Sequence, residues 1–188
     1  SDFGKTLSAN AIFQFDHSSS EFAATHQVCW FSDNAADIQA NWDKFRNSKM
    51  MNTSGIYETW NENVEEEATI LGQSLIADPS GFDLRFAVVY LVKVEDPASY
   101  GAAFTKMKKA FDATGRDGVL ELHEILAGGE PGVTHEVIVR SKSMADWLEG
   151  RNEFVSSKAF QDFISSTRPY SEVLHVLSGS PVKFYNAE

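Results

Sequence analysis

Glu121 and His123 are the residues of this sequence best suited to acid–base chemistry. They stand two positions apart in a run at residues 119–126 whose alternation is typical of a β-strand. We expect Leu120 and Leu122 to pack beneath helices, which turns Glu121 and His123 to the opposite side. A histidine beside a carboxylate can act as a general base with an orienting partner. The alternation therefore predicts an acid–base pair on one face of a sheet.

His175 is the third candidate for this catalytic set. In the predicted strand at residues 172–177, Leu174 and Val176 are expected to pack under helices. His175 then points to the same side as Glu121 and His123, where it can orient the base. The competing interpretation is that the three residues make polar contacts across an interface between two sheets.

Five further residues are candidates for binding a small ligand. Tyr90 and Trp30 are strand aromatics that can stack on a flat molecule, and Arg151 can bind an acidic group. His26 and His135 each follow a threonine at the start of a predicted strand. The competing interpretations are core packing for the aromatics, a structural role for the Thr-His pairs and a solvated helix face for Arg151.

Metal binding is the weaker hypothesis for the polar residues. His123, His135 and His175 have side chains that suit zinc, iron or copper, but their spacing matches no known ligand pattern. The run around Asp117 resembles an EF-hand calcium loop, yet Ala113 occupies the first ligand position. We therefore predict neither a metal nor a cofactor.

An internal repeat organises the elements that carry these residues. When the sequence is shifted by 109 positions, residues 21–49 align without a gap on residues 130–158, and ten of the 29 positions are identical. A repeat of about a hundred residues is typical of a duplicated small domain.

The second copy has the pattern β-α-β-β-α-β, the order of a ferredoxin-like unit. Its predicted strands lie at residues 86–94, 119–126, 134–140 and 172–177, its helices at 99–114 and 143–168, and a short extra strand at 181–185. The first copy keeps the later half of this order, with strands at 10–15, 26–31 and 66–71 and a helix at 35–49. We predict an α+β fold of two tandem ferredoxin-like units with facing antiparallel sheets, at residues 1–80 and 81–188. The first unit lacks the opening strand and helix.

Composition limits the classes of partner. The 188 residues carry a net charge of −11 and are 43% apolar, as in ordinary globular proteins. No basic stripe is present to neutralise phosphates, which argues against nucleic acid and anionic membranes. No apolar run approaches the roughly 18 residues that cross a bilayer. With no visible targeting signal and a single cysteine, we expect a cytoplasmic protein without an intrachain disulfide.

The second copy resembles the dimeric α+β barrel superfamily and, within it, the antibiotic-biosynthesis-monooxygenase-like group. The resemblance rests on the element order and on three segments: Ser157-Lys158-Ala159-Phe160, Leu174-His175-Val176-Leu177 and Pro181-Val182-Lys183-Phe184-Tyr185. It implies two ferredoxin-like units whose facing sheets enclose a small ligand, either in a homodimer or within one chain.

The resemblance also implies a function. Some members of this group oxidise electron-rich aromatic molecules without metal or flavin, and others do isomerase, lyase or haem-degrading work. In the oxidising members, a base in the pocket takes a proton from a phenolic substrate. Here that base would be His123 with Glu121. The alternative is a non-catalytic ligand-binding or assembly protein, because the first copy has Ile12 and Gln14 where the second has Glu121 and His123.

Overall fold

The computed structural model describes residues 9–17, 24–47, 56–65 and 69–186. The chain divides into two compact units that each draw on separate stretches of sequence. Unit 1 consists of Ser1–Gln14, Ala24–Glu67 and Pro181–Glu188, and unit 2 of Phe15–Ala23 and Ala68–Ser180. Both mix helices with strands, and every described strand pairing is antiparallel. The α+β class is therefore confirmed, whereas the tandem ferredoxin-like arrangement stays a prediction.

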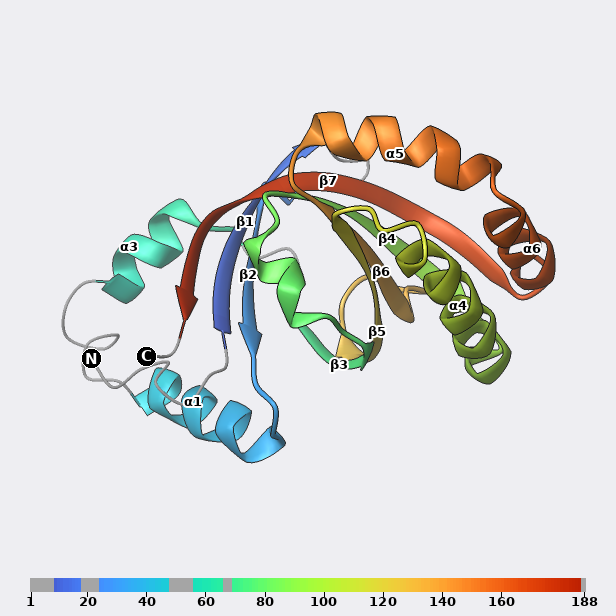
Figure 1. Cartoon of the computed structure of the whole chain (residues 1–188). Coiled ribbons are helices and arrows are strands. Elements are labelled where there is room, and N and C mark those ends of the chain that lie inside the picture. The colour runs from blue at the N-terminus through green and yellow to red at the C-terminus, as the bar shows by residue number, and fades with distance from the viewer. Residues whose placement is uncertain (1–8, 18–23, 48–55, 66–68, 187–188) are drawn as a thin grey trace. The chain divides into compact units, whose positions relative to one another are not determined.

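Unit 2 is built on a sheet with the strand order β7-β4-β6-β5-β3. Its strands are β3 (Ile70–Ile76), β4 (Phe86–Val94), β5 (Gly118–Gly128), β6 (His135–Ser141) and the part of β7 (Ser171–Asn186) up to Ser180. Three helices, α4 (Pro97–Asp112), α5 (Met144–Ser156) and α6 (Lys158–Thr167), lie on one side of these strands, as Figure 1 shows. We call that side the helix face and the opposite side the open face.

The main core of unit 2 lies on the helix face. Asp96 caps α4 by accepting a hydrogen bond from the Ser99 backbone N–H, and Pro97 starts the helix without needing a donor. The helix then presents a buried stripe formed by Tyr100, Phe104 and Met107. This stripe packs on strand residues that include Leu120 and Leu122, as the alternation of β5 predicts. Glu121 and His123 consequently belong to the open face.

A smaller apolar cluster occupies the open face. Its buried members are Val89, Leu91, Val133 and Leu177. The short helix η1 (Pro79–Asp83) also lies against this face, because a Cβ atom on Gly81 would come within 3.0 Å of the Arg140 side chain and 2.8 Å of Val119. The open face of unit 2 is therefore partly covered by its own chain.

Unit 1 contains the part of β1 (Ala9–His17) up to Gln14, its hairpin partner β2 (His26–Phe31), and helices α1 (Ala35–Asn47) and α3 (Ile56–Asn63). The bounds of α1 and α5 differ by 109 residues at both ends, which is the shift of the sequence repeat. The hairpins do not coincide in register. Ile12 pairs with Val28, whereas Glu121, 109 positions later, pairs with Ile138 and not Val137.

Most predicted elements appear within a few residues of their expected bounds, and three differ. The predicted helix at 143–168 is two helices, because Ser157 has an extended conformation (ψ 149°) and caps α6. The two predicted closing strands form one continuous strand, β7. The strand expected at 66–71 is found as β3, which pairs with β5 of unit 2; residues 66–68 lie outside the described part.

Candidate functional site

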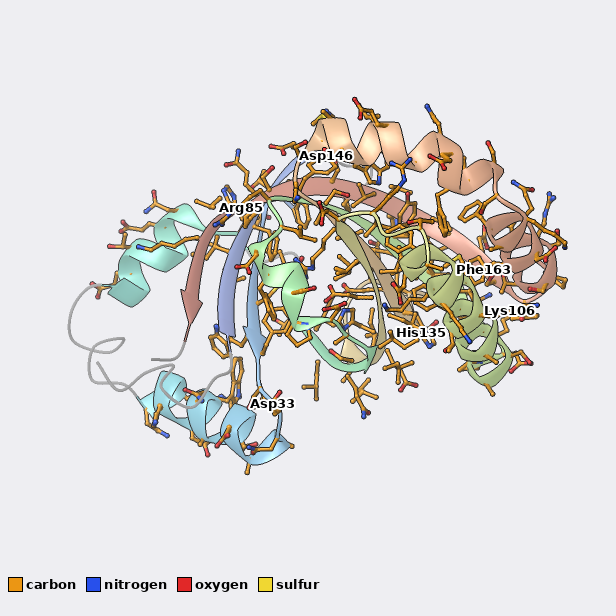
Figure 2. All side chains as sticks on the ribbon, viewed as in Figure 1. Asp33, Arg85, Lys106, His135, Asp146 and Phe163 are labelled. Atoms are coloured by element: carbon orange, nitrogen blue, oxygen red, sulfur yellow. The ribbon has the colours of Figure 1, made fainter. Side chains whose placement is uncertain are left out.

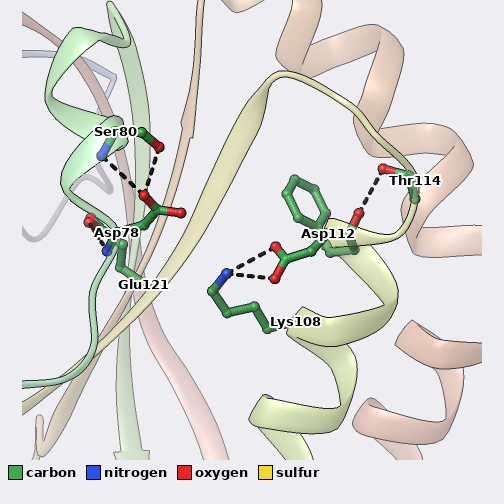
Figure 3. A network of polar contacts seen from close by, with 7 residues as sticks. Asp78, Ser80, Lys108, Asp112, Thr114 and Glu121 are labelled. Carbon is green, nitrogen blue, oxygen red and sulfur yellow. Dashed lines mark hydrogen bonds and ion pairs between the residues drawn. The ribbon is translucent and has the colours of Figure 1, made fainter.

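Glu121 forms a buried ion pair on the open face. Its carboxylate Oε2 accepts a hydrogen bond from Arg140 Nε at 2.7 Å, and the two side chains are only 6% and 4% exposed. The Asp78 backbone N–H donates weakly to the other oxygen at 3.4 Å, which Figure 3 shows beside the Asp78–Ser80 turn. The Phe82 ring of η1 lies 5.8 Å from the Arg140 guanidinium. Strand β6 and helix η1 therefore fix both partners of the pair.

This environment keeps Glu121 charged. Burial alone would raise the pKa of Glu121, but the favourable contacts of His123 and Arg140 outweigh burial and lower the pKa below its ordinary value. A carboxylate held in this way is a weak base. Glu121 therefore supplies a negative charge at this point of the open face.

His123 is the histidine of this cluster. Its Nδ1 atom lies 2.9 Å from Ser74 Oγ on β3, which fixes the orientation of the ring. Its Nε2 atom lies 3.9 Å from Glu121 Oε2, too far for a hydrogen bond. Within the described part of the chain, this buried Nε2 atom has no hydrogen-bond partner. The arrangement leaves one ring nitrogen of an oriented imidazole free to exchange a proton.

Glu136 completes the cluster, and sequence reasoning missed both Glu136 and Arg140. Glu136 pairs directly with His123 across β5 and β6, so their side chains share the open face. Burial raises the pKa of Glu136, and the charges of His123 and Arg140 only partly oppose that effect. The sequence could have identified both residues, because alternation along the predicted strand at residues 134–140 puts Glu136 and Arg140 on the same side.

His175 also lies on the open face but does not orient His123. It pairs across the sheet with Leu91, Leu91 pairs with Glu136, and Glu136 pairs with His123. Three strand spacings of about 4.8 Å separate the two histidines by roughly 14 Å. His175 Nε2 instead contacts Glu130 Oε1 at 2.9 Å, which ties the β5–β6 loop to β7. The expected orienting role is therefore corrected.

The expected packing of Leu174 is wrong for a related reason. The pairing of β4 with β7 shifts register between Leu91 and Val92, which leaves Leu174 as an extra residue of β7. Leu174 then packs in the open-face cluster and not under helices. Val176 keeps the expected side, opposite Tyr90, but remains 44% exposed.

Two of the predicted ligand-binding residues meet on the helix face. Tyr90 packs against the main core, where burial raises the pKa of its phenol, and the charge of Arg151 on α5 together with its hydrogen bond opposes that effect. Arg151 also lies over the Trp147 ring at 5.7 Å. Tyr90 is thus separated by the sheet from Glu121 and His123, so it does not line the same site.

His135 also belongs to the helix face. It is 1% exposed, its ring centroid lies 6.1 Å from that of Tyr100, and its Nδ1 atom lies 2.9 Å from Thr134 Oγ1. Figure 2 shows it on the side of the sheet where Phe163 of α6 lies. Burial lowers the pKa of His135, which favours the neutral ring of a core residue. A structural role therefore replaces the expected ligand contact.

The remaining two candidates lie in unit 1. Trp30 packs edge-to-face on Trp42 of α1, with ring centroids 5.6 Å apart, so its aromatic side chain contributes to packing. His26 is exposed, and its Nδ1 atom lies 3.0 Å from Thr25 Oγ1. The Thr-His contact of unit 2 is therefore repeated in unit 1, as expected of equivalent positions in a repeat.

The described residues contain no group of three or more histidine, cysteine or acidic side chains able to hold a metal ion. His135 is divided from His123 and His175 by the sheet, so the three-histidine set considered from the sequence is not brought together. Asp117 of the EF-hand-like run forms an ion pair with Lys142.

Two solved structures resemble this chain in fold. One, described as an anthrone oxidase-like protein, is 10% identical with a TM-score of 0.62; the match covers 97% of this chain and 79% of that one. The other, described as a candidate monooxygenase from Lactobacillus acidophilus NCFM, is 10% identical with a TM-score of 0.59 and coverages of 98% and 81%. The similarity shows that these two proteins share the fold of this chain.

Other comparisons add no family assignment. No protein-family model matches the chain, and no curated protein matches its sequence significantly. Among the helices in the described ranges, none is long and apolar enough to cross a membrane.

Proposed function

We propose that this chain is a small-molecule enzyme of the monooxygenase type, with His123 as its catalytic base. The observation that carries the proposal is the buried Nε2 atom of His123, which no described residue satisfies while Ser74 holds the opposite ring nitrogen. A neutral imidazole in this position can take a proton from an acidic O–H or C–H group. Arg140 and Glu121 form the fixed charges beside it.

The chemistry follows from the type of substrate. An electron-rich aromatic molecule that loses a proton to Nε2 becomes an anion able to react with dioxygen. When a ring-activated CH₂ group becomes a carbonyl, one oxygen atom enters the product and the other leaves as water. That reaction needs no external reductant, and we propose that it proceeds without a bound metal or flavin.

The two structural neighbours support this choice of chemistry over others. One is described as anthrone oxidase-like and the other as a candidate monooxygenase, and both share the fold across nearly the whole chain. Anthrone, which has an acidic CH₂ group between two aromatic rings, is therefore the first substrate to test. Because fold does not fix function, the argument rests on the cluster around His123.

The test measures dioxygen consumption with anthrone, corrected for its spontaneous oxidation without protein. We expect His123→Ala to lower kcat by about 10²- to 10⁴-fold, the usual contribution of a general base. His17→Ala removes an exposed histidine outside the cluster and should leave turnover unchanged. Glu121→Gln should lower turnover while leaving substrate binding measurable by fluorescence.

The results separate catalysis from passive binding. Turnover that is unaffected by His123→Ala would refute the assignment of the base. Binding of anthrone without any turnover by the wild-type protein would favour the alternative of a non-catalytic ligand-binding protein. A wider set of phenols and hydroquinones then defines the substrate class if anthrone itself is not oxidised.

We also propose that the chain contains two ferredoxin-like repeats, at residues 1–80 and 81–188, and that it acts as a cytoplasmic homodimer. The shared Thr-His contacts and the matching bounds of α1 and α5 support the duplication. Sedimentation at several concentrations tests the dimer, and the neighbours' type of fold motivates that experiment.

A further inference from the structure

A serine, a histidine and a glutamate lie in sequence of contact on the open face of unit 2. Ser74 Oγ on β3 lies 2.9 Å from Nδ1 of His123 on β5, and Nε2 of the same ring lies 3.9 Å from Glu121 Oε2. A nucleophile in contact with a base that a third group orients from the other side is the arrangement of acyl-transfer enzymes. The proposed function uses the imidazole but gives the Ser74 hydroxyl no chemical role.

The two outer members of this set are suitably placed. Ser74 is exposed on β3, which stands at one end of the strand order, so a substrate can reach its hydroxyl. Glu121 is fixed by hydrogen bonds from Arg140 Nε and from the Asp78 backbone N–H. Its 3.9 Å distance from the ring exceeds a hydrogen bond, but catalytic contacts of this kind are often long before a substrate binds and then shorten.

The register of β3 provides a candidate donor to a substrate oxygen. The pairing of β3 with β5 is irregular between Ser74 and Ile76, and the described register gives Leu75 no partner on β5. The extra residue of a bulge is left unpaired, and bulges next to active sites re-aim side chains. The backbone N–H of Leu75, directly after Ser74, is therefore the candidate donor to a carbonyl oxygen that becomes charged. Leu71 and Leu75 are 54% and 45% exposed, which adds apolar surface on the same strand.

Other hydroxyl–histidine contacts of this chain lack the third group. Nδ1 of His17, His26 and His135 lies 2.9, 3.0 and 2.9 Å from a serine or threonine hydroxyl. Among the described residues, a carboxylate oxygen lies within 4.0 Å of a ring nitrogen at His123 and at His175. The contact of His123 with Ser74 is thus distinguished by the carboxylate beyond the ring and not by its length.

We propose that Ser74 is the nucleophile of a second activity, the hydrolysis of small esters with an apolar acyl group, with His123 as its base and Glu121 orienting the ring. The two activities use the two tautomers of the neutral imidazole. With the proton on Nδ1, the ring donates to Ser74 and Nε2 is the base of the proposed function. With the proton on Nε2, toward Glu121, Nδ1 accepts the hydrogen bond of the Ser74 hydroxyl.

The reaction has two balanced steps. Ser74 Oγ attacks the ester carbonyl carbon while its proton moves to Nδ1 of His123. The bond from that carbon to the alcohol oxygen then breaks, and the alcohol leaves with this proton. Water next attacks the acyl group on Ser74, and its proton passes through Nδ1 to the serine oxygen as the acid leaves. One ester and one water become one acid and one alcohol, so no oxidant or reductant is needed.

The first test treats the wild-type protein with a fluorophosphonate, whose phosphorus forms a bond to an activated serine oxygen as fluoride leaves. Peptide mass spectrometry then locates the label. We expect the label on Ser74 and not on Ser178, whose hydroxyl lies at the same 2.9 Å from a histidine, His17. A wild-type protein in which Ser74 is labelled no more than Ser178 would overturn the proposal.

The second test follows the release of p-nitrophenolate from p-nitrophenyl butyrate. Ser74→Ala should lower kcat/KM by about 10²-fold or more, as the loss of a catalytic base does, and Ser178→Ala, the matched control, should leave it unchanged. Ser74 is exposed, so its replacement should not impair folding. Hydrolysis that persists in Ser74→Ala would show that an imidazole alone attacks this reactive ester, which contradicts the assignment of the nucleophile.

The two activities have separate readouts, because phenolate release consumes no dioxygen and anthrone oxidation releases no phenolate. Labelled Ser74 with Ser74-dependent ester turnover, in a protein that oxidises no aromatic substrate, would support this proposal and refute the proposed function. Oxidation by a protein whose Ser74 is neither labelled nor needed for ester turnover would do the reverse.

Discussion

Removal of the Glu121 carboxylate should destabilise unit 2 far more than the loss of its two hydrogen bonds implies. Glu121→Leu leaves the Arg140 guanidinium 4% exposed and without its carboxylate, which typically costs about 3–5 kcal/mol. At about 1.4 kcal/mol for each factor of ten, β5 and β6 amides that exchange through global unfolding should exchange roughly 10²- to 4 × 10³-fold faster. Hydrogen exchange is the suitable assay because it reports on these strands individually.

A double variant tests the reason for that loss. In Glu121→Leu with Arg140→Met, no charge is left unpaired, and apolar replacements of buried ion pairs are often neutral or stabilising. We expect most of the protection to return. The exposed Lys158–Asp162 pair supplies the control, and Asp162→Asn should cause no resolvable change in β5 and β6. If Glu121→Leu alone changes exchange no more than Asp162→Asn does, the buried pair is not what fixes the open face.

Two further predictions concern pH and backbone geometry. Because burial raises the folded-state pKa of Glu136, its carboxyl costs stability as the pH rises from the unfolded value of about 4.3. Glu136→Gln should therefore raise the free energy of unfolding in urea at pH 7 and leave it unchanged at pH 4; equal stability at both would contradict this. Gly128→Ala should destabilise more than Gly115→Ala, although both have positive φ (75° and 68°), because a Cβ at position 128 would lie 1.9 Å from the Thr69 carbonyl oxygen. A Cβ at position 115 would have nothing within 4 Å, so Gly115→Ala should lower the free energy of unfolding by only about 1–2 kcal/mol. Equal losses for the two variants in urea unfolding would refute the close approach of Thr69 to position 128.

The sequence allowed β5 to be interpreted correctly because one of its sides is strongly apolar. Leu120 and Leu122 can only face a core, and the period of two then assigns Glu121 and His123 to the other side. Strand β4 offers no such contrast. It is buried on both sides, so alternation could not tell whether Tyr90 faced the helices or the open face. The same limit hid the contact of Tyr90 with Arg151.

The errors at Leu174 and His175 have other origins. The side of Leu174 depends on the irregular register between β4 and β7, two strands far apart in the sequence, and no local pattern in residues 172–177 predicts that irregularity. Alternation along a strand also does not reveal how many strands separate two residues that share one face of a sheet. Sharing a face made His175 a reasonable partner for His123, but the strand order inserts β4 and β6 between them.

His123 and His135 of unit 2 lie on opposite faces of the sheet. His123 and His135 each have a buried Nε2 atom with no hydrogen-bond partner among the described residues, and each has its Nδ1 atom near a hydroxyl group. His135 lies beside Tyr100 on the helix face, where burial lowers the pKa of the ring and the charge of Glu124, its cross-strand partner, only partly opposes that effect. His123 lies near two carboxyl groups, those of Glu121 and of its cross-strand partner Glu136. The two rings therefore differ in the number of carboxyl groups around them and in the face of the sheet that they share with the helices or with η1, and not in the imidazole itself.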